Sequence, residues 1–191
     1  MPVKELGAKS RLALPERDIV AIAMTRDVLA AARETDGVVD VVTVAAGPGG
    51  LDADLLAAAA TRPDASVAVL MADLPALRAS ELAAALALAA NADRSVVADA
   101  DGTGTVLLTA RPGRLLAPAY GPGSRARHVR LGARDLTGLL GTLVPGLRCD
   151  VDTTADLDRA VALGVGPETA AALRRSRPDH SRTPCGGMMP T

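Results

Sequence analysis

The chain is nearly without aromatic side chains. Among its 191 residues there is no phenylalanine and no tryptophan, and the one tyrosine is Tyr120. Apolar residues still make up 49% of the chain, so a core is possible, but it must be built from Leu, Val, Ile and Ala. A disordered chain, which is poor in apolar residues, is excluded. The length suits a single α/β domain with a full core.

The chain also has few cysteines and almost no net charge. The two cysteines, Cys149 and Cys185, lie far apart without the spacing of a metal site, and we expect Cys149 to be a small core residue. This usage fits a reduced, cytoplasmic setting. A formal net charge of −1 gives no support to nucleic-acid binding.

Long apolar runs are absent as well. The stretch 82–90 is too short and too rich in alanine to span a membrane. The residues after Met1 do not form a secretory signal pattern. We therefore expect a chain that does not insert into a bilayer.

The patterns that are present alternate between strand and helix. The unbroken apolar run 67–71 is typical of a strand buried on both faces, and the β-branched run 38–44 predicts another strand. Polar residues 176–191 predict a disordered tail. The alternation predicts the α/β class, with a three-layer, mostly parallel sheet covered by helices on both faces. In full, strands are expected at 38–44, 66–71, 95–98, 105–110 and 147–151, and helices at 15–33, 51–60, 80–90 (Ser80 as N-cap), 124–131, 135–143, 155–163 and 167–174.

Three carboxylates follow predicted strands. Asp73 comes after the strand 66–71, and Asp150 and Asp152 end the strand 147–151 with their side chains on one face. Ligands of open α/β sheets bind at the carboxyl ends of strands, and carboxylates gathered there would repel each other unless a cation joins them. Mg²⁺ is the cation that hard oxygen ligands favour. There are alternatives to a metal site. Asp73 could simply form a turn, and the segment after Asp152 could simply provide the N-cap of a helix through Thr154.

Cations and glycine-rich loops complete the candidate site. Lys4, Lys9 and Arg11 precede a predicted helix, where cations and free N–H groups could hold a triphosphate, although such a loop could equally be a solvated one. The loops 102–105 and 121–124 offer backbone N–H groups and hydroxyls for an anion, such as a phosphorylated acceptor. Either loop alone could be a simple turn.

Four further polar residues receive no role in the predicted site. Asp99 and Asp101 belong to a D-x-D-G pattern, which is more often a turn than a metal site. His128 has no obvious Ser or Cys partner that would mark a catalytic group, and His180 lies in the predicted tail, so neither is assigned a role. The candidate site therefore has no obvious general base.

Taken in order, these motifs resemble those of a known family. PVK and AKSRL lie within residues 2–12, ADLPAL at 72–77, DGTGT at 101–105, GPGS at 121–124 and LRCDVDT at 147–153. The set is similar to the phosphoenolpyruvate / 2-phospho-L-lactate guanylyltransferases of coenzyme F(420) biosynthesis, which have a glycosyltransferase-A-like nucleotidyltransferase fold. The resemblance covers most of residues 1–166 and implies a single nucleotidyltransferase domain over residues 1–175.

The resemblance also implies a reaction. An oxygen of the acceptor phosphate would attack the α-phosphate of GTP in a Mg²⁺-dependent step and release pyrophosphate. The composition hints at an actinobacterial source, where phosphoenolpyruvate is the expected acceptor. The product would pass to the next transferase, and a homodimer is possible. By this resemblance Mg²⁺ would be held by Asp73, Asp150 and Asp152, the GTP phosphates would be met by Lys4, Lys9 and Arg11, and phosphoenolpyruvate by Thr105, Gly121 and Ser124.

The chain departs from the family pattern at two places. The family has several strand residues before the PVK motif, with which this chain starts, so we expect a shortened first strand. A βα-sized piece is missing near residues 44–50, beside the nucleotide half of the site. Two alternatives follow: a degenerate paralogue that binds a phosphoacid or nucleotide with little catalysis, or a molybdenum-cofactor-type nucleotidyltransferase. The second is disfavoured because the LAAG-type first loop is absent.

Overall fold

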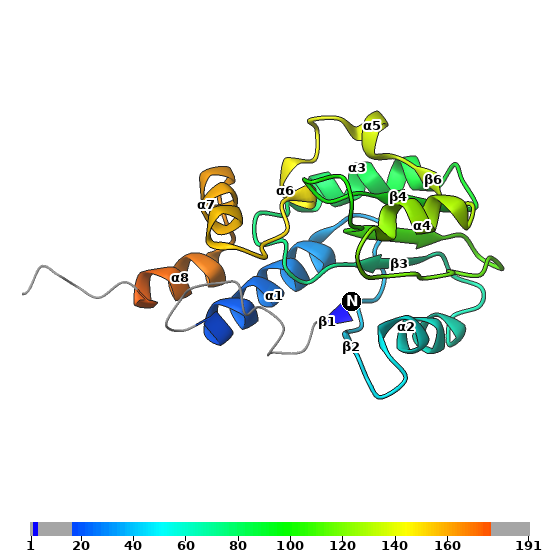
Figure 1. Ribbon diagram of the computed structural model, residues 1–191, viewed down its shortest axis with the longest axis horizontal. Helices are drawn as coiled ribbons and strands as arrows, with labels where there is room; N and C mark the ends of the chain where they lie inside the picture. Colours follow the sequence, from blue (N-terminus) through cyan, green and yellow to red (C-terminus); the bar gives the residue numbers. More distant parts are fainter. Residues whose placement is uncertain (1, 4–16, 177–191) are drawn as a thin grey trace, which may run out of the picture.

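The structure is a computed structural model that describes residues 2–3, as backbone only, and residues 17–176. The predicted roles of Lys4, Lys9 and Arg11, and the predicted disorder of residues 177–191, lie outside the described residues. The strands are β1 (Pro2–Val3), β2 (Val44–Ala45), β3 (Val67–Leu70), β4 (Arg94–Val97), β5 (Leu107–Ala110) and β6 (Arg134–Asp135). The helices are α1 (Arg17–Glu34), α2 (Leu51–Ala60), α3 (Ala79–Ala89), α4 (Ser124–Arg130), α5 (Thr137–Leu140), α6 (Pro145–Arg148), α7 (Thr154–Leu163) and α8 (Pro167–Ser176). Strands and helices alternate as expected from β1 to β4, but β5 follows β4 directly and the described chain ends in four successive helices (Figure 1).

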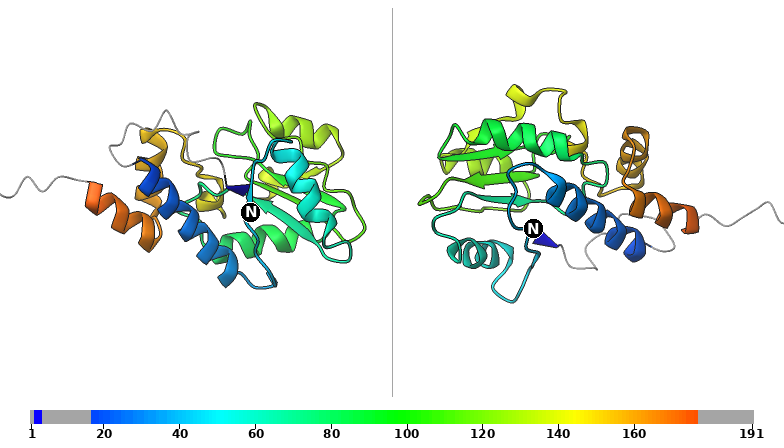
Figure 2. Two further views of the ribbon diagram at one scale, coloured as in Figure 1. Left: turned by 90° about the horizontal axis from the view of Figure 1, so that it is seen from below. Right: turned by 180° about the vertical axis from the view of Figure 1, so that it is seen from behind.

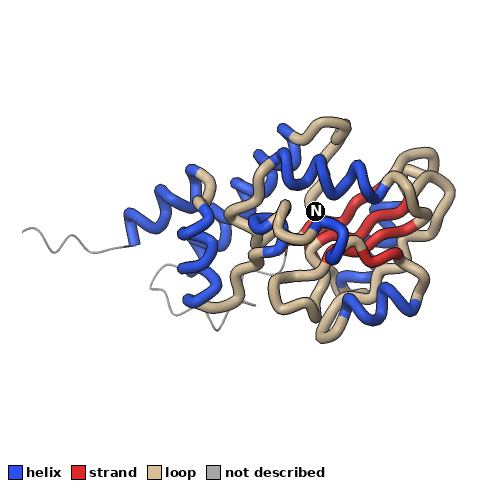
Figure 3. The backbone as a smooth tube through the Cα atoms, turned by 90° about the horizontal axis from the view of Figure 1, so that it is seen from above, coloured by secondary structure: helices blue, strands red, loops and turns tan. Residues whose placement is uncertain are grey.

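The main sheet has four strands in the order β3-β5-β4-β6. Figure 3 shows the strands in red, with helices in blue around them. β5 is antiparallel to both β3 and β4, and only the β4–β6 pair is parallel. The α/β class is confirmed, and β3, β4 and β6 point the same way, but the prediction of a mostly parallel sheet fails at β5, which runs against the other three and makes the sheet mixed. The cause is the short connection 98–106 between β4 and β5, because a parallel return needs a crossover of a dozen or more residues.

Two predicted strands are not found in the sheet. Only β2 remains of the expected strand 38–44, and it pairs with β1 in a separate two-stranded sheet. The expected strand 147–151 is replaced by α6 and a loop. The reason is the buried carboxylate of Glu81, which accepts the N–H groups of Gly146 (3.1 Å) and Leu147 (2.9 Å) and so stabilises a helical turn there.

Helices cover both faces of the main sheet (Figure 1). Leu70, Val97 and Leu107 point to one face and pack in a core cluster with Leu82 of α3. Their neighbours Val69, Val96 and Leu108 point to the other face and pack with Leu55 of α2. Alternation along the strands therefore produces two apolar faces, each with its own helix.

Several predicted boundaries need correction. The residue before α3 is Arg78, so Ser80 lies inside the helix and is not its N-cap. The expected helix 135–143 is divided into β6 and α5. The cap of α7 is Thr153 and not Thr154. Among the described residues, no helix is both long and apolar enough to cross a bilayer.

Helices α1 and α8 pack side by side (Figure 2). A buried carboxylate joins them. Asp27 in α1 accepts the N–H groups of Glu168 (3.0 Å) and Thr169 (2.8 Å) in the first turn of α8. Two N–H groups at a helix start are satisfied in this way by one side chain.

We expect the Asp27→Ala substitution to lower the free energy of unfolding by about 2–4 kcal/mol, because it leaves both amides without an acceptor. Urea denaturation followed by circular dichroism would measure the loss. Asp18→Ala, at an exposed carboxylate of the same helix, is the control and should change the midpoint little. Equal, small effects of the two substitutions would refute the capping role of Asp27.

Candidate active site

The structure places the three predicted carboxylates on two segments that run side by side. The backbone N–H of Val151 donates to the carbonyl of Asp73 at 3.0 Å, so the chain after α6 runs alongside the chain after β3. Asp150 and Asp152 flank Val151, whose side chain is fully buried in the core. Asp73 is buried, and the other two carboxylates are half-buried.

The packing of α7 fixes this arrangement. Thr153 accepts from the N–H of Asp156 (3.3 Å), and the carboxylate of Asp156 accepts in return from the N–H of Thr153 (2.7 Å) and from that of Asp152 (3.2 Å). This capping box starts α7 directly after Asp152. Since the helix start cannot slide, the backbone of Asp152 is held in place.

The pKa of Asp150 is raised by its surroundings. Burial, followed by the nearby carboxylates of Asp73, Asp99 and Asp152, raises the pKa of Asp150 to about 7. Within the described residues, no three His, Cys, Asp or Glu side chains are gathered tightly enough to form a metal site as they stand. The carboxylates thus share one electrostatic neighbourhood without forming a closed ligand shell.

Asp99 organises the loop that connects this neighbourhood to β5. Its carboxylate accepts the N–H groups of Thr103 (2.9 Å) and Gly104 (2.7 Å), which confirms the turn that the D-x-D-G pattern predicts. Arg148 donates to the carbonyls of Ala98 (3.1 Å) and Asp99 (2.8 Å) and ties the loop to α6. The loop 99–104 therefore bridges the carboxylates and the residue that follows it, Thr105.

Gly104 is required by this loop. A Cβ atom at this position would lie 2.2 Å from Oδ2 of Asp99, far inside contact distance. We expect Gly104→Ala to break the two loop hydrogen bonds and to lower turnover about 10-fold or more, with a cost of about 1–3 kcal/mol in stability. Steady-state kinetics and thermal unfolding of the purified variant would test this. Gly138→Ala, where a Cβ meets nothing within 4 Å, is the control, and equal behaviour of the two variants would contradict the prediction.

Beyond the loop, two buried hydroxyls face each other. The hydroxyl of Ser124, at the start of α4, lies 3.1 Å from that of Thr105, and both side chains are buried. Gly121 lies on the same loop with φ of +111°, a conformation that favours glycine. The structure thus brings the three predicted acceptor residues to one place, and the bonds of Arg125 to Gly102 and Thr103 join the two glycine-rich loops.

Two residues that the sequence left without a role also belong to this cluster. His128 is fully buried between Thr105 and the backbone of Ala119. Arg127 donates to the carbonyls of Ala119, Tyr120 and Pro122 and fixes the glycine-rich loop. Their i, i+3 and i, i+4 spacing from Ser124, on a helix that follows the loop, is the signal that could have found them.

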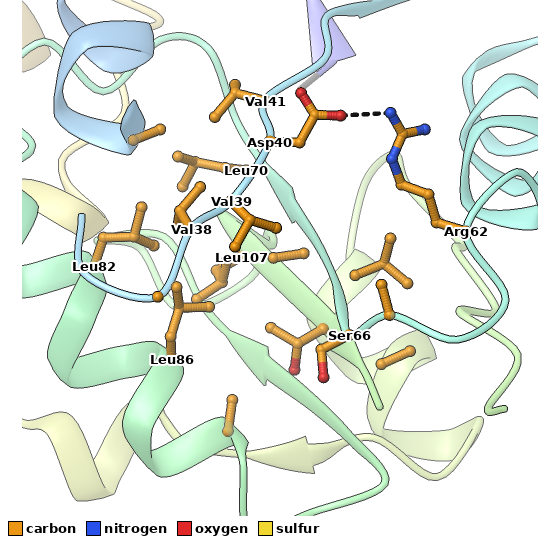
Figure 4. Close-up of a pocket in the computed structure, with 18 of the residues that line it drawn as sticks. Val38, Val39, Asp40, Val41, Arg62, Ser66, Leu70, Leu82, Leu86 and Leu107 are labelled. Carbon is orange, nitrogen blue, oxygen red and sulfur yellow. Dashed lines mark hydrogen bonds and ion pairs between the residues drawn. The ribbon is translucent and has the colours of Figure 1, made fainter. Parts of the chain in front are cut away.

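A cavity lies elsewhere, away from the candidate site (Figure 4). It has a volume of about 300 Å³ and lies between segment 37–42, α3 and the strands β3 and β5. An ion pair joins Asp40 to Arg62 at its side, and this contact lowers the pKa of Asp40. None of the predicted site residues among the described residues lines the cavity. It is a consequence of segment 38–43 running past the sheet without joining it.

Comparison with known proteins gives the family. A family model described as guanylyl transferase CofC like matches residues 2–182. The chain belongs to this family. The match extends over the carboxylates, the loop 99–104 and the Thr105–Ser124 pair, so all the described parts of the candidate site lie inside it.

Three similar curated proteins carry the name phosphoenolpyruvate guanylyltransferase. The protein of Streptomyces scabiei is 45% identical over 207 residues, which covers 92% of this chain and 94% of the relative. That of Streptomyces avermitilis is 46% identical over 203 residues, covering 92% and 93%. A third, from Frankia casuarinae, is 61% identical over 116 residues, which is 61% of this chain but 40% of the relative.

The length of these alignments is informative. An alignment of 207 residues that includes 92% of a 191-residue chain contains positions that this chain does not fill. The Streptomyces member of the guanylyl transferase family therefore carries residues without a counterpart here.

Proposed function

We propose that the chain transfers GMP from GTP to phosphoenolpyruvate and releases pyrophosphate. The observation that carries this proposal is the near full-length similarity to relatives named phosphoenolpyruvate guanylyltransferase, at 44–46% identity over 92% of the chain. The carboxylates and the hydroxyl cluster, joined by one loop, are what such a reaction requires. 2-Phospho-L-lactate is the second acceptor to test.

The chemistry needs no general base. A phosphate oxygen of phosphoenolpyruvate, which is already ionised at neutral pH, forms a bond to the α-phosphorus of GTP. The bond from that phosphorus to the bridging oxygen of the β-phosphate breaks, and pyrophosphate leaves with the electron pair. The protein has to screen negative charge and align the reactants. This is consistent with a site that contains carboxylates, hydroxyls and backbone N–H groups.

We propose that Asp73, Asp150 and Asp152 would hold Mg²⁺. Their oxygens are the hard ligands that this ion prefers. Burial and then the neighbouring carboxylates raise the pKa of Asp150, and a bound cation would offset the charge part of that effect. When bound, Mg²⁺ would offset charge on the phosphates. The chain's own part is to hold the three carboxylates together through the Val151–Asp73 backbone bond and the capping box of α7.

The acceptor would lie on the other side of loop 99–104. There we propose that Thr105, Gly121 and Ser124 bind its phosphate and carboxylate, with Arg127 holding the loop in shape. Lys4, Lys9 and Arg11 are proposed for the GTP phosphates on the basis of the sequence resemblance. The same resemblance favours a glycosyltransferase-A-like, three-layer fold, and helices on both faces of the main sheet fit that proposal.

A second reading is a paralogue that binds a phosphoacid with little catalysis. It is favoured by the residues that the Streptomyces relatives have and this chain lacks, and by the open cavity beside β3. The two readings share the acceptor site and differ only in turnover.

A pyrophosphate-release assay separates the two readings. The full chain is incubated with Mg²⁺, GTP and either phosphoenolpyruvate or 2-phospho-L-lactate, with ATP in place of GTP and 3-phosphoglycerate in place of the acceptor as controls. We expect release that depends on GTP, on the acceptor and on Mg²⁺. Binding of phosphoenolpyruvate by calorimetry without any release would favour the paralogue and overturn the enzyme reading.

A further inference from the structure

His128 has both ring nitrogens in hydrogen bonds inside the protein. The side chain in α4 is fully buried, with Nδ1 2.9 Å from the hydroxyl of Thr105 and Nε2 2.8 Å from the backbone nitrogen of Ala119. A backbone amide can only donate, so Nε2 must be the acceptor and carries no proton. A neutral imidazole then has its single proton on Nδ1.

The surroundings keep the ring neutral and fixed. Burial lowers the pKa of His128, and the charges of Arg127 and Arg94 act in the same direction, against that of Asp52. The ring of Tyr120 packs edge-on against the imidazole, with centroids 5.1 Å apart. A protonated ring would place a second N–H against that of Ala119, so the geometry itself selects the form with hydrogen on Nδ1.

The position of this proton decides how many donors the hydroxyl pair can offer. Thr105 and Ser124 have two hydroxyl protons, and one is used in the 3.1 Å bond between them, whichever hydroxyl donates. Because Nδ1 donates to Thr105, the remaining hydroxyl proton is not needed by the histidine. With the hydrogen on Nε2 instead, Nδ1 would be an acceptor and would take that proton.

We propose that His128 is a positioning residue of the acceptor site, which donates to Thr105 and thereby frees one hydroxyl proton of the Thr105–Ser124 pair to bind an anionic oxygen of a small phosphorylated carboxylic acid. This proposal rests on the proposed function, since it assumes that the acceptor binds at these hydroxyls. It assigns His128 to acceptor affinity, and not to the chemical step or to GTP.

The kinetic test compares two substitutions. His128→Leu keeps much of the volume and removes the Nδ1–H that holds the Thr105 hydroxyl in its orientation. We expect the KM for phosphoenolpyruvate to rise about 10-fold, with kcat and the KM for GTP changed less than about 2-fold. His128→Asn places an amide N–H near the position of Nδ1 and should recover most of the affinity. A merely structural histidine would instead lower kcat or affect both substrates alike, and that result would overturn the proposal.

A spectroscopic test uses the unaltered protein and covers the case in which a variant does not fold. Nitrogen-15 NMR of the side chains distinguishes the two imidazole tautomers. The chain has two histidines, so a His180→Gln variant identifies the His128 signals. We expect the proton on Nδ1, with and without phosphoenolpyruvate, and a proton on Nε2 would overturn the proposal.

The two proposals fail in different ways. If the unaltered protein turns over and His128→Leu binds phosphoenolpyruvate normally, only the role of His128 is wrong. If the unaltered protein releases no pyrophosphate, the proposed function is wrong. Calorimetric titration of both proteins with phosphoenolpyruvate then decides the role of His128, with equal affinities overturning it.

Discussion

Asp150→Asn is expected to make the protein more stable without Mg²⁺ and nearly inactive with it. In the metal-free state the Asp150 carboxylate is partly buried and has three other carboxylates nearby, and its burial, followed by this repulsion, raises its pKa from 3.8 to about 7. An asparagine removes the charge and keeps the shape. The same change removes a proposed Mg²⁺ ligand, so turnover should fall about 1000-fold or more.

The sign of the stability effect follows from proton linkage. Because the pKa of Asp150 is higher in the folded state than in the unfolded one, the folded state binds more protons between about pH 4 and pH 7. The contribution of Asp150 to stability is fully present below pH 4 and is lost as the pH rises to about 7. Above that pH the folded protein carries the whole penalty, which asparagine relieves.

The expected gain at pH 8 is about 1–2 kcal/mol, or about 2–6 °C in Tm, which is less than the full pKa shift would give because water screens a half-buried carboxylate. At pH 4 the two proteins should have nearly equal Tm values. Thermal unfolding in EDTA at both pH values, together with the pyrophosphate assay, measures both effects. Asp158→Asn, at an exposed carboxylate of α7, is the control. A variant that loses stability at pH 8, or keeps normal turnover, would contradict the assignment of Asp150.

Thr105→Val should weaken acceptor binding strongly and leave GTP binding intact. Valine keeps the shape of threonine but removes the hydroxyl that meets both His128 and Ser124. The substitution removes a hydrogen bond to a charged phosphate and leaves the buried donors of His128 and Ser124 without their partner. We therefore expect the KM for phosphoenolpyruvate to rise about 10- to 100-fold. The KM for GTP should change less than about 3-fold.

Two further variants control this experiment. Thr105→Ser retains the hydroxyl and should keep most of the affinity. Thr103→Val changes an exposed threonine of the same loop, whose hydrogen bond to Asp99 uses only the backbone N–H, and should have little effect. Steady-state kinetics with each substrate varied in turn would supply the values. An unchanged KM for phosphoenolpyruvate in Thr105→Val would remove this residue from the acceptor site.

The sequence predicted the gathering of carboxylates for a reason that was only half right. Asp73 does follow a strand, β3, but Asp150 and Asp152 follow a helical turn, α6, and not a strand. A single backbone bond, from Val151 to Asp73, brings them together. The order of the motifs and the apolar pattern were enough to predict that these carboxylates come together. The helical turn α6 was not predictable, because it depends on Glu81, which lies 65 residues away from Gly146 in sequence.

The direction of β5 and the role of His128 were not predicted, for different reasons. Apolar periodicity does not report strand direction, but the predicted strands 95–98 and 105–110 leave only the segment 99–104 between them, which is too short for a parallel crossover, so the reversal of β5 could have been expected from the sequence. His128 gains its partners only when α4 packs against the loop 99–105 and the chain at Ala119. A lone histidine without a neighbouring nucleophile gives no local signal of such a role.

The central claim is that this chain joins GMP to phosphoenolpyruvate although it lacks residues that its relatives possess. Phosphorus-31 NMR of a reaction with Mg²⁺, GTP and phosphoenolpyruvate tests it most directly, because it observes the new bond. We predict loss of the GTP and phosphoenolpyruvate signals, equal growth of pyrophosphate, and a new pair of coupled diphosphate resonances. Unchanged spectra with a folded protein that still binds phosphoenolpyruvate would contradict the claim.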